Sequence, residues 1–218
     1  MFSKLTVTDK KKEVKESMTE KGNCKNSIEE AIEVAAQAHN GQFRKGTSTP
    51  YITHPYAVGL LLMEVGCSET LIIAGILHDT VEDTELTLDT IRKDFGDTVA
   101  DIVDGCSENK SLRWRERKTE RIEALKTAST EICIVTCADK LHNLRTVISE
   151  YDNIGEAVWD RFHGGLEAQE WYYRSVLDSL RTQKESKIKD SNSGVVQKQF
   201  NFIFEQLQQV VMYIFEGQ

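Results

Sequence analysis

The 218-residue sequence contains very little proline and no long apolar run. Pro50 and Pro55 are its two prolines, and segments that alternate β-branched and polar residues are also scarce. Since this pattern favours helices over sheet, we expect an all-α fold. No stretch approaches the roughly 18 uninterrupted apolar residues of a transmembrane helix, and the N-terminal segment lacks the apolar centre of a secretory signal peptide. We therefore expect a cytoplasmic protein with no membrane segment.

Cysteine occurs in an odd number of positions and in no CxxC pair. Cys133 and Cys137 are one helical turn apart, but no nearby residue completes a thiolate metal site. These features indicate reduced thiols in a cytoplasmic protein rather than a disulfide framework. The five cysteines are Cys24, Cys67, Cys106, Cys133 and Cys137.

Basic residues are outnumbered, because 27 Lys and Arg stand against 35 Asp and Glu, which gives a formal net charge of −8. Non-specific nucleic-acid binding needs a basic surface for phosphate contacts, so this balance argues against a nucleic-acid partner. A small anionic substrate is still compatible with it, since a metal ion and a few cations can dominate the electric field inside a cleft.

Composition and periodicity divide the chain into four parts. Residues 1–25 predict a flexible tail, residues 26–182 one helical domain, residues 183–196 a linker, and residues 197–218 a final amphipathic helix. This last helix either docks on the same core or mediates self-association in a homo-oligomer, and the pattern does not choose between the two. The predicted helices, about 8–10 in all, lie near residues 27–39, 55–65, 69–80, 87–96, 97–106, 114–127, 131–150, 165–182 and 197–218.

Histidine and aspartate, residue types that can bind hard metal ions, occur in separate segments of the sequence. The candidate ligands are His54, the adjacent His78 and Asp79, and Asp139. His78 and Asp79 follow the apolar run LIIAGIL, which should bury whatever comes next. Burying an imidazole and a carboxylate is unfavourable unless a partner satisfies them, and a divalent cation does so directly. Two imidazoles with two carboxylates suit Mn²⁺, Fe²⁺ or Zn²⁺, and the absence of a thiolate favours Mn²⁺. His39, on an apolar helical face, is expected to be a hydrogen-bonded core residue instead.

Two further carboxylates, Glu82 and Asp83, follow in the segment HDTVED. Glu82 is four residues after His78, one turn further along the same face if the helix continues. Beside a metal, such a pair can activate a water molecule and pass a proton to a leaving oxygen. The competing interpretation is an exposed acidic loop that also includes Glu85. The neighbouring His–Asp pair favours the catalytic interpretation.

Taken in order, these residues resemble the HD-domain superfamily of metal phosphohydrolases. More narrowly, they resemble the hydrolase domain of the RelA/SpoT family in its stand-alone small alarmone hydrolase form. The matching segments, which together span about half the chain from residue 38 to residue 146, are AHNGQFRKGTSTPYITHPYAVG (38–59), AGILHDTVEDTELTLDTIRKDFGDTVADIVDGCSE (74–108) and ADKLHNLRT (138–146). The nucleotide-synthesising domain of longer members has no counterpart here, so synthesis is not expected.

The resemblance implies an HD-type helical bundle around a single Mn²⁺ on the four predicted ligands, with Glu82 and Asp83 as the catalytic pair. Family members hydrolyse guanosine 3′,5′-bis(diphosphate) or the corresponding pentaphosphate, giving GDP or GTP and pyrophosphate. The implied substrate partner is therefore a guanine nucleotide. The implied substrate-binding residues are Arg44, Lys45, Asn143, Arg145, Thr146 and Lys110.

Alternatives remain for the contacts and for the activity. Arg44 and Lys45 also fit a solvated basic loop, Arg145 a structural ion pair, and Lys110 a surface charge run with its basic neighbours. The same metal site would serve another phosphorylated nucleotide, such as NADPH losing its 2′-phosphate. A non-catalytic nucleotide sensor is the third possibility, against which the intact carboxylate pair argues.

Overall fold

The computed structural model describes residues 28–188 and 194–216. Within these ranges the regular elements are helical, apart from one isolated β-bridge between Phe43 and Pro50, so the all-α prediction is confirmed. The predicted tail, residues 1–25, lies outside the described residues. The elements are α2 (Ile28–Ala38), α3 (Thr53–Glu64), α4 (Glu69–Leu77), α5 (Thr80–Asp83), α6 (Leu88–Phe95), α7 (Asp97–Cys106), α8 (Trp114–Leu125), α9 (Thr130–Ile154), the 3₁₀ helix η1 (Gly155–Arg161), α10 (Gly165–Ile188) and α11 (Val195–Glu216).

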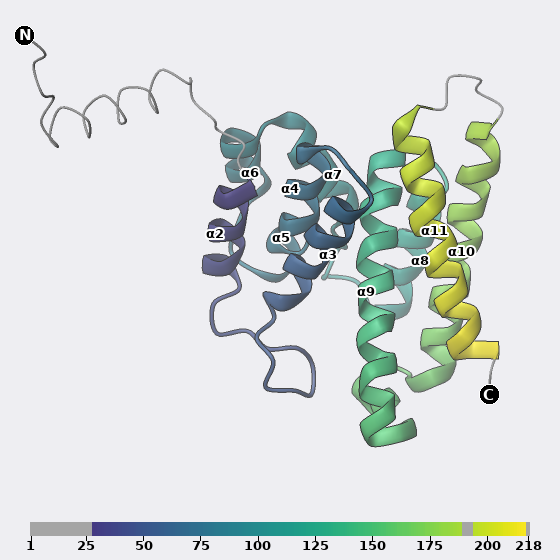
Figure 1. The fold of residues 1–218 in the computed structure, drawn as a ribbon. Helices are drawn as coiled ribbons and strands as arrows, with labels where there is room; N and C mark the ends of the chain where they lie inside the picture. The colour runs from purple at the N-terminus through teal and green to yellow at the C-terminus, as the bar shows by residue number, and fades with distance from the viewer. Residues whose placement is uncertain (1–27, 189–193, 217–218) are drawn as a thin grey trace, which may run out of the picture.

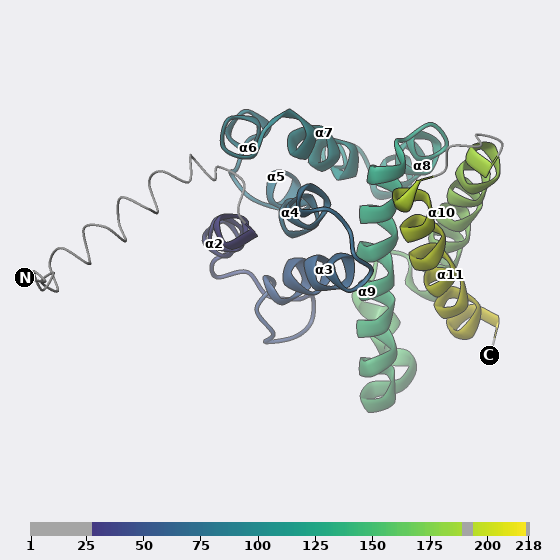
Figure 2. The same cartoon turned by 45° about the horizontal axis from the view of Figure 1, so that its top comes forward.

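The long helix α9 separates two groups of helices (Figure 1). Helices α2 to α7 lie on one side of it, and α8, α10 and α11 lie on the other (Figure 2). Helix α9 contacts α3, α4 and α7 on the first side and α11 and α10 on the second. A side chain in the middle of α9 can therefore reach residues from both groups.

Helix α4 is the buried centre of the first group. The Ser68 side chain caps its N-terminus by accepting a hydrogen bond from the Leu71 backbone N–H, and every residue from Leu71 to Leu77 is buried. Its close approach to α3 depends on two glycines. A Cβ added at Gly59 would lie 2.6 Å from Ile76, and one added at Gly75 would overlap Leu62. This tight packing brings the first turn of α3 beside the end of α4, where the two predicted histidine ligands lie.

Helix α11 docks on the same hydrophobic core as the other helices. Docking is one of the two alternatives that the sequence left open for this helix. Phe200, Phe204 and Leu207 are buried in the hydrophobic cluster that also contains residues of α4 and α9. Its self-association remains a prediction. None of the described helices combines the length and the apolar character needed to cross a bilayer.

The structure also shortens the predicted linker. Helix α10 continues to Ile188 and α11 begins at Val195, whereas the sequence predicted a linker over residues 183–196. The Lys- and Glu-rich composition that suggested a linker also favours helix formation, and Lys184 Nζ forms a 2.9 Å ion pair with Glu205 of α11.

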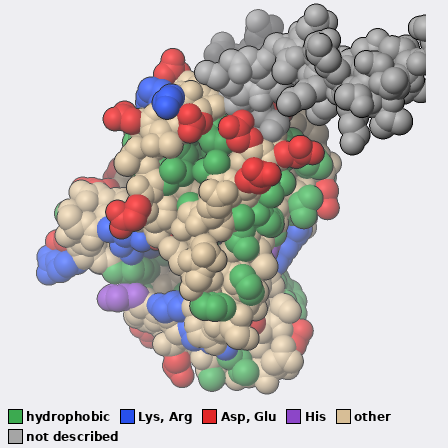
Figure 3. Space-filling view, turned by 90° about the vertical axis from the view of Figure 1, so that its left-hand side faces the viewer, with side chains coloured by type: hydrophobic (Ala, Val, Ile, Leu, Met, Phe, Trp, Pro, Cys, Tyr) green, Lys and Arg blue, Asp and Glu red, His purple; other side chains and the backbone are tan. Residues whose placement is uncertain are grey.

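Acidic side chains gather on the upper part of the face seen from the α2 side, whereas several basic side chains lie lower (Figure 3). Glu29, Glu30 and Glu33 of α2 contribute exposed or partly exposed carboxylates. Part of the acidic excess of the sequence thus lies on this face. A local cluster of cations elsewhere in the fold is therefore compatible with the negative net charge.

Candidate metal centre and substrate cavity

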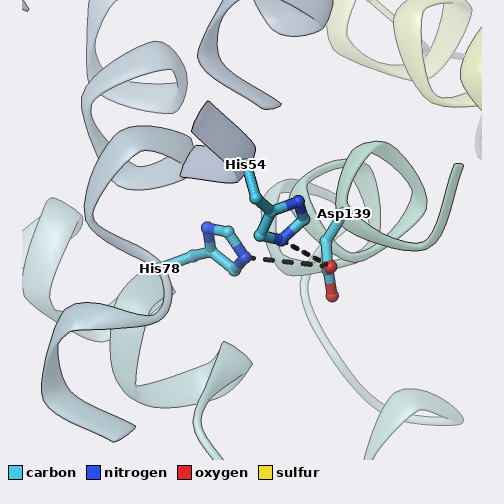
Figure 4. Close-up of side chains that lie close together, drawn as sticks. All are labelled: His54, His78 and Asp139. Carbon is cyan, nitrogen blue, oxygen red and sulfur yellow. Dashed lines mark ion pairs between the residues drawn. The ribbon is translucent and has the colours of Figure 1, made fainter. Parts of the chain in front are cut away.

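Three predicted ligands converge at the junction of α3, α4 and α9 (Figure 4). His54 belongs to the first turn of α3, His78 caps the end of α4, and Asp139 lies in the middle of α9. One potential ligand atom from each lies within 4.8 Å of the others. Asp139 Oδ1 is 3.2 Å from His54 Nε2 and 3.8 Å from His78 Nε2. All three residues are buried, so their polar atoms face one another away from bulk water.

Asp79, the fourth predicted ligand, reaches the same two imidazoles. Its Oδ2 lies 3.2 Å from His78 Nε2 and 3.5 Å from His54 Nε2. The phenol of Tyr51 donates a 2.5 Å hydrogen bond to this oxygen. Asp79 is therefore held next to the three-residue cluster by a partly buried hydroxyl that the sequence did not single out.

The hydrogen bonds of the imidazoles leave their Nε2 atoms directed to the cluster. His78 Nδ1 donates to the Gly75 carbonyl at 2.7 Å, which assigns the lone pair of the neutral ring to Nε2. His78 Nε2 is buried and forms no hydrogen bond with any described residue. His54 Nδ1 shares a 2.7 Å hydrogen bond with His142 Nδ1. Metal-bound histidines are commonly oriented in this way by a partner on the second nitrogen, so the donor set fits a divalent cation.

Opposite charges hold the carboxylates of the cluster in their ionised form. Burial alone would lower the pKa of His78, but Asp79 and Asp139 raise it to about 9. Burial lowers the pKa of His54, which Asp139 only partly offsets. Burial would raise the pKa of Asp139, but Lys140 and His54 hold it well below its ordinary range. The carboxylates therefore keep the negative charge that a cation requires.

The acidic pair lies on the short helix α5, half-buried rather than on a fully exposed loop. Glu82 Oε2 accepts a 3.0 Å hydrogen bond from the Glu108 backbone N–H, and burial together with the Glu108 charge raises the pKa of Glu82. Asp83 Oδ2 accepts a 3.2 Å hydrogen bond from Tyr51, and its Oδ1 pairs with Lys110. Tyr51 thus connects a predicted metal ligand to a predicted catalytic carboxylate.

A cavity of about 310 Å³ is separated from the metal cluster by one layer of side chains, since Tyr51, Lys140 and Asn143 line it and contact Asp79 or Asp139. Four of the six predicted substrate residues line it, namely Arg44, Lys45, Asn143 and Thr146. The Arg44 guanidinium donates a 2.7 Å hydrogen bond to Asn143 Oδ1, and Asn143 Nδ2 donates a 2.5 Å hydrogen bond to Asp139 Oδ1. The basic side chains around the cavity are Arg44, Lys45, Arg117, Lys118 and Lys140.

Two predicted substrate residues lie elsewhere. The Arg145 guanidinium donates a 2.7 Å hydrogen bond to Gln206 of α11, and neither Arg145 nor Lys110 belongs to the cavity lining. A helix rotates about 100° per residue, so Arg145 points away from the face that Asn143 shares with Asp139. Lys110 instead pairs with Asp83. The predicted direct contact of these two cations with the substrate stays a prediction.

Several residues with evident roles were not predicted. Lys140 Nζ forms a 2.7 Å ion pair with Asp139 Oδ2. Glu108 binds Lys118 and Arg117 at 2.7 and 2.8 Å, so it holds two cavity cations in place. Tyr172 lines the cavity, and its buried hydroxyl has no hydrogen-bond partner among the described residues. Of Lys140, Glu108 and Tyr172, only Lys140 had a hint in the sequence, because it directly follows the predicted ligand Asp139.

Comparisons with known proteins find similar sequences. Over 128 residues the chain is 40% identical to guanosine-3′,5′-bis(diphosphate) 3′-pyrophosphohydrolase MESH1 of Danio rerio, covering 56% of this chain and 71% of that one. It is 42% identical over 124 residues to a GTP pyrophosphokinase of Streptomyces coelicolor, covering 55% of this chain but only 14% of that relative. The chain therefore spans a small part of the long bacterial relatives.

A solved structure and a family model agree with these relatives. The structure described as a metazoan ortholog of SpoT that hydrolyzes ppGpp superposes with a TM-score of 0.62 at 29% identity, covering 85% of this chain and 96% of that one. Residues 31–161, which contain the three clustered ligands, Asp79 and the acidic pair, match the HD domain model. The chain belongs to the HD-domain family.

Proposed function

We propose that this chain is a metal-dependent phosphohydrolase that removes the 3′-diphosphate of guanosine 3′,5′-bis(diphosphate) or its pentaphosphate, releasing pyrophosphate. The observation that carries the proposal is the convergence of His54, His78 and Asp139 beside a cavity lined by cations. The names of the relatives support the choice of substrate. A cytoplasmic location is part of the proposal, and it is supported by Cys67, Cys106 and Cys137, which form no disulfide with any described residue.

The ion is proposed to be one Mn²⁺, held by His54, His78, Asp79 and Asp139. This mixed nitrogen and oxygen set contains no thiolate, which favours Mn²⁺ over Zn²⁺. When bound, the ion supplies Lewis-acid polarisation of the phosphoryl group and of the attacking water. The protein side chains supply the orientation, since each imidazole is fixed through its second nitrogen.

Each carboxylate of the acidic pair carries out one of the two proton transfers in the hydrolysis. Asp83, oriented by Tyr51 and Lys110, accepts a proton from the water whose oxygen forms the new bond to the 3′ phosphorus. The bond between this phosphorus and the ribose 3′ oxygen breaks, and Glu82 donates a proton to that oxygen. A raised pKa suits Glu82 to carry the proton before transfer. The products are pyrophosphate and GDP, or GTP from the pentaphosphate.

The cavity supplies recognition of the anionic nucleotide. The Arg44 guanidinium, which lies 5.6 Å from the Tyr51 ring centre, offers a planar cation on which a base can stack. Lys45 and Lys118 lie over aromatic rings, which position their charges along the cavity wall. The Tyr172 hydroxyl, without a partner among the described residues, is available to a phosphate oxygen.

The decisive assay incubates the purified chain with Mn²⁺ and, separately, guanosine tetraphosphate, NADPH and GTP, and measures pyrophosphate and orthophosphate independently. We expect pyrophosphate from the tetraphosphate, loss of turnover on chelation, and recovery when Mn²⁺ is restored. Orthophosphate from NADPH alone would reassign the substrate. Saturable nucleotide binding without turnover would establish a sensor.

Three variants test the residue roles. His78→Ala should lose both metal retention and turnover. Glu82→Gln should retain the metal but slow turnover by roughly 10²-fold, the scale of a lost acid–base group. The matched control is Glu85→Gln, which removes an exposed carboxylate three residues further on and should leave turnover within about twofold. Equal rates for Glu82→Gln and Glu85→Gln would remove Glu82 from the mechanism.

A further inference from the structure

Glu108 lies between the predicted proton donor and the cations of the substrate cavity. Its backbone N–H donates a 3.0 Å hydrogen bond to Glu82 Oε2, and its carboxylate accepts hydrogen bonds of 2.7 and 2.9 Å from Lys118 Nζ. The same carboxylate pairs with Arg117 Nε at 2.8 Å, and the Glu108 side chain is only 6% exposed. A single residue in the segment between α7 and α8 therefore contacts both the acid and two cations that line the cavity.

The hydrogen bond from Glu108 decides which oxygen of Glu82 carries the proton. A neutral carboxyl group has one O–H donor and one carbonyl oxygen, and the carbonyl oxygen is the better acceptor. Because Oε2 accepts the Glu108 N–H, the proton of neutral Glu82 lies on Oε1. In the proposed hydrolysis the Oε1–H bond breaks, and the proton joins the ribose 3′ oxygen, which leaves phosphorus with the bonding electron pair.

The charges around Glu82 determine how firmly it keeps this proton. Burial and the negative charge of Glu108 raise the pKa of Glu82, although the Glu108 N–H opposes them. Burial opposes the ionisation of Glu108, but Lys118 and the neighbouring cations lower its pKa, so Glu108 carries its charge. The other charged groups around this pair are Asp79 and Asp83 at α5, Lys110 before α8, Arg117 in α8 and Lys140 in α9.

The Glu108 carboxylate offsets the cations that the anionic substrate requires. Glu108, Arg117 and Lys118 together carry one net positive charge, and without the Glu108 carboxylate they would carry two. An added positive charge favours the ionised form of a nearby carboxyl group, so Glu82 would lose its proton more readily. Glu108 thus allows cations and a protonated acid to coexist in one site.

We propose that Glu108 is the positioning residue for the proton donor: its N–H directs the Glu82 proton to Oε1, and its carboxylate shields that proton from Lys118 and Arg117. This inference deepens the proposed function and rests on it, because it assigns proton donation in the hydrolysis to Glu82. The hydrogen bond and the shielding are nevertheless properties of the chain without substrate, so both can be measured in the absence of turnover.

NMR spectroscopy of the full metal-free chain, labelled with ¹⁵N and with ¹³C at the glutamate Cδ, measures both properties. The Glu82 carboxyl signal is identified by its loss in Glu82→Gln. The Glu108 amide signal should shift with pH at the midpoint of the Glu82 carboxyl signal, and Glu82→Gln should remove this shift. Glu108→Gln should move the Glu82 midpoint to lower pH. A Glu108 amide signal that does not follow the titration of Glu82 would overturn the positioning.

The pH dependence of kcat, measured with Mn²⁺ and saturating tetraphosphate, gives an independent readout. Its basic limb reports the loss of the proton from the general acid. Glu108→Gln should move the midpoint of this limb about one pH unit lower, the scale of one charge roughly 10 Å away inside a protein. The matched control is Glu120→Gln, which removes an exposed carboxylate of α8 and should move the midpoint by less than about 0.2 pH units.

A double variant distinguishes the effect of charge from damage to the fold. Glu108→Gln combined with Lys118→Met restores the local net charge and should return the midpoint most of the way to the wild-type value. Lys118→Met alone should move it to higher pH. Equal midpoints for Glu108→Gln and Glu120→Gln, or no return in the double variant, would overturn the shielding. A wild-type chain without turnover would instead overturn the proposed function, and the NMR titrations would still decide how Glu108 acts on Glu82.

Discussion

Tyr51→Phe removes one hydroxyl that donates to Asp79 at 2.5 Å and to Asp83 at 3.2 Å. No role was predicted for Tyr51 from the sequence, although it lies in the matching segment 38–59, so the substitution tests contacts that the structure alone supplies. A hydrogen bond to a charged group contributes about 1.5–3 kcal/mol, and partners of metal ligands typically affect metal affinity 10- to 100-fold.

The expected loss of metal affinity lies at the lower end of that range, because the hydroxyl holds Asp79 in both the metal-free and metal-bound protein. The part of the hydrogen-bond energy that is the same in both states cancels from the binding free energy. Only the part that orients the Asp79 carboxylate for the metal contributes to affinity. We therefore expect the Mn²⁺ affinity of Tyr51→Phe to fall about tenfold, or about 1.4 kcal/mol. The free energy of unfolding of the metal-free protein should also fall by about 1–2 kcal/mol.

Isothermal titration calorimetry with Mn²⁺ measures the affinity, and urea unfolding after chelation measures the stability. The matched control is Tyr56→Phe in the first turn of α3, which removes a 2.9 Å hydrogen bond to the Ile32 carbonyl. Its Mn²⁺ affinity should equal that of the wild type. The reasoning is refuted if Tyr51→Phe keeps an affinity within twofold of the Tyr56→Phe value.

Three further predictions concern the core, the buried acid and the cavity. Phe204→Ala should reduce the free energy of unfolding by about 3–5 kcal/mol in urea titrations, whereas Phe202→Ala, at a side chain 54% exposed, should cost well under half of that. Burial opposes ionisation of Glu108, but neighbouring cations lower its pKa. The ionised carboxylate therefore stabilises the folded protein above about pH 4.5, and this contribution is lost as the pH falls. Glu108→Gln should therefore flatten the fall in Tm between pH 5 and pH 3. Arg44→Lys loses the planar fork that reaches Asn143 and should raise KM for the tetraphosphate about tenfold with little change in kcat.

The sequence predicted the parts of the site that follow from residue type and local position. His54, His78 and Asp139 had to be satisfied in a buried setting, and the structure brings them together. His39 was predicted as a hydrogen-bonded core residue, and it is 2% exposed with Nδ1 paired to Gln42 at 2.8 Å. Both conclusions depend on the cost of burying polar atoms, which the apolar neighbours in the sequence already indicate.

Contacts between distant segments could not be predicted in the same way. The hydrogen bond from Tyr51 to Asp79 and the one between His54 and His142 join positions 28 and 88 residues apart, so they depend on how α3, α4 and α9 pack. The position of Arg145 was different, because helical rotation alone separates it from the face of Asp139. The placement of Arg145 on another face could be inferred from the sequence, whereas the docking of α11 could not, since an amphipathic face suits a core or a partner equally.

Asn143 connects substrate recognition to the metal centre through an amide with one possible orientation. Its Oδ1 accepts from Arg44 and its Nδ2 donates to the Asp139 carboxylate. The flipped amide would place N–H groups against a guanidinium and an oxygen against a carboxylate, both repulsive. One lone pair of Oδ1 and one N–H of Nδ2 remain free of these two bonds, so a nucleotide hydroxyl can bind Asn143 without breaking either. A ribose contact at this position would therefore add to the link between cavity and metal ligand rather than compete with it.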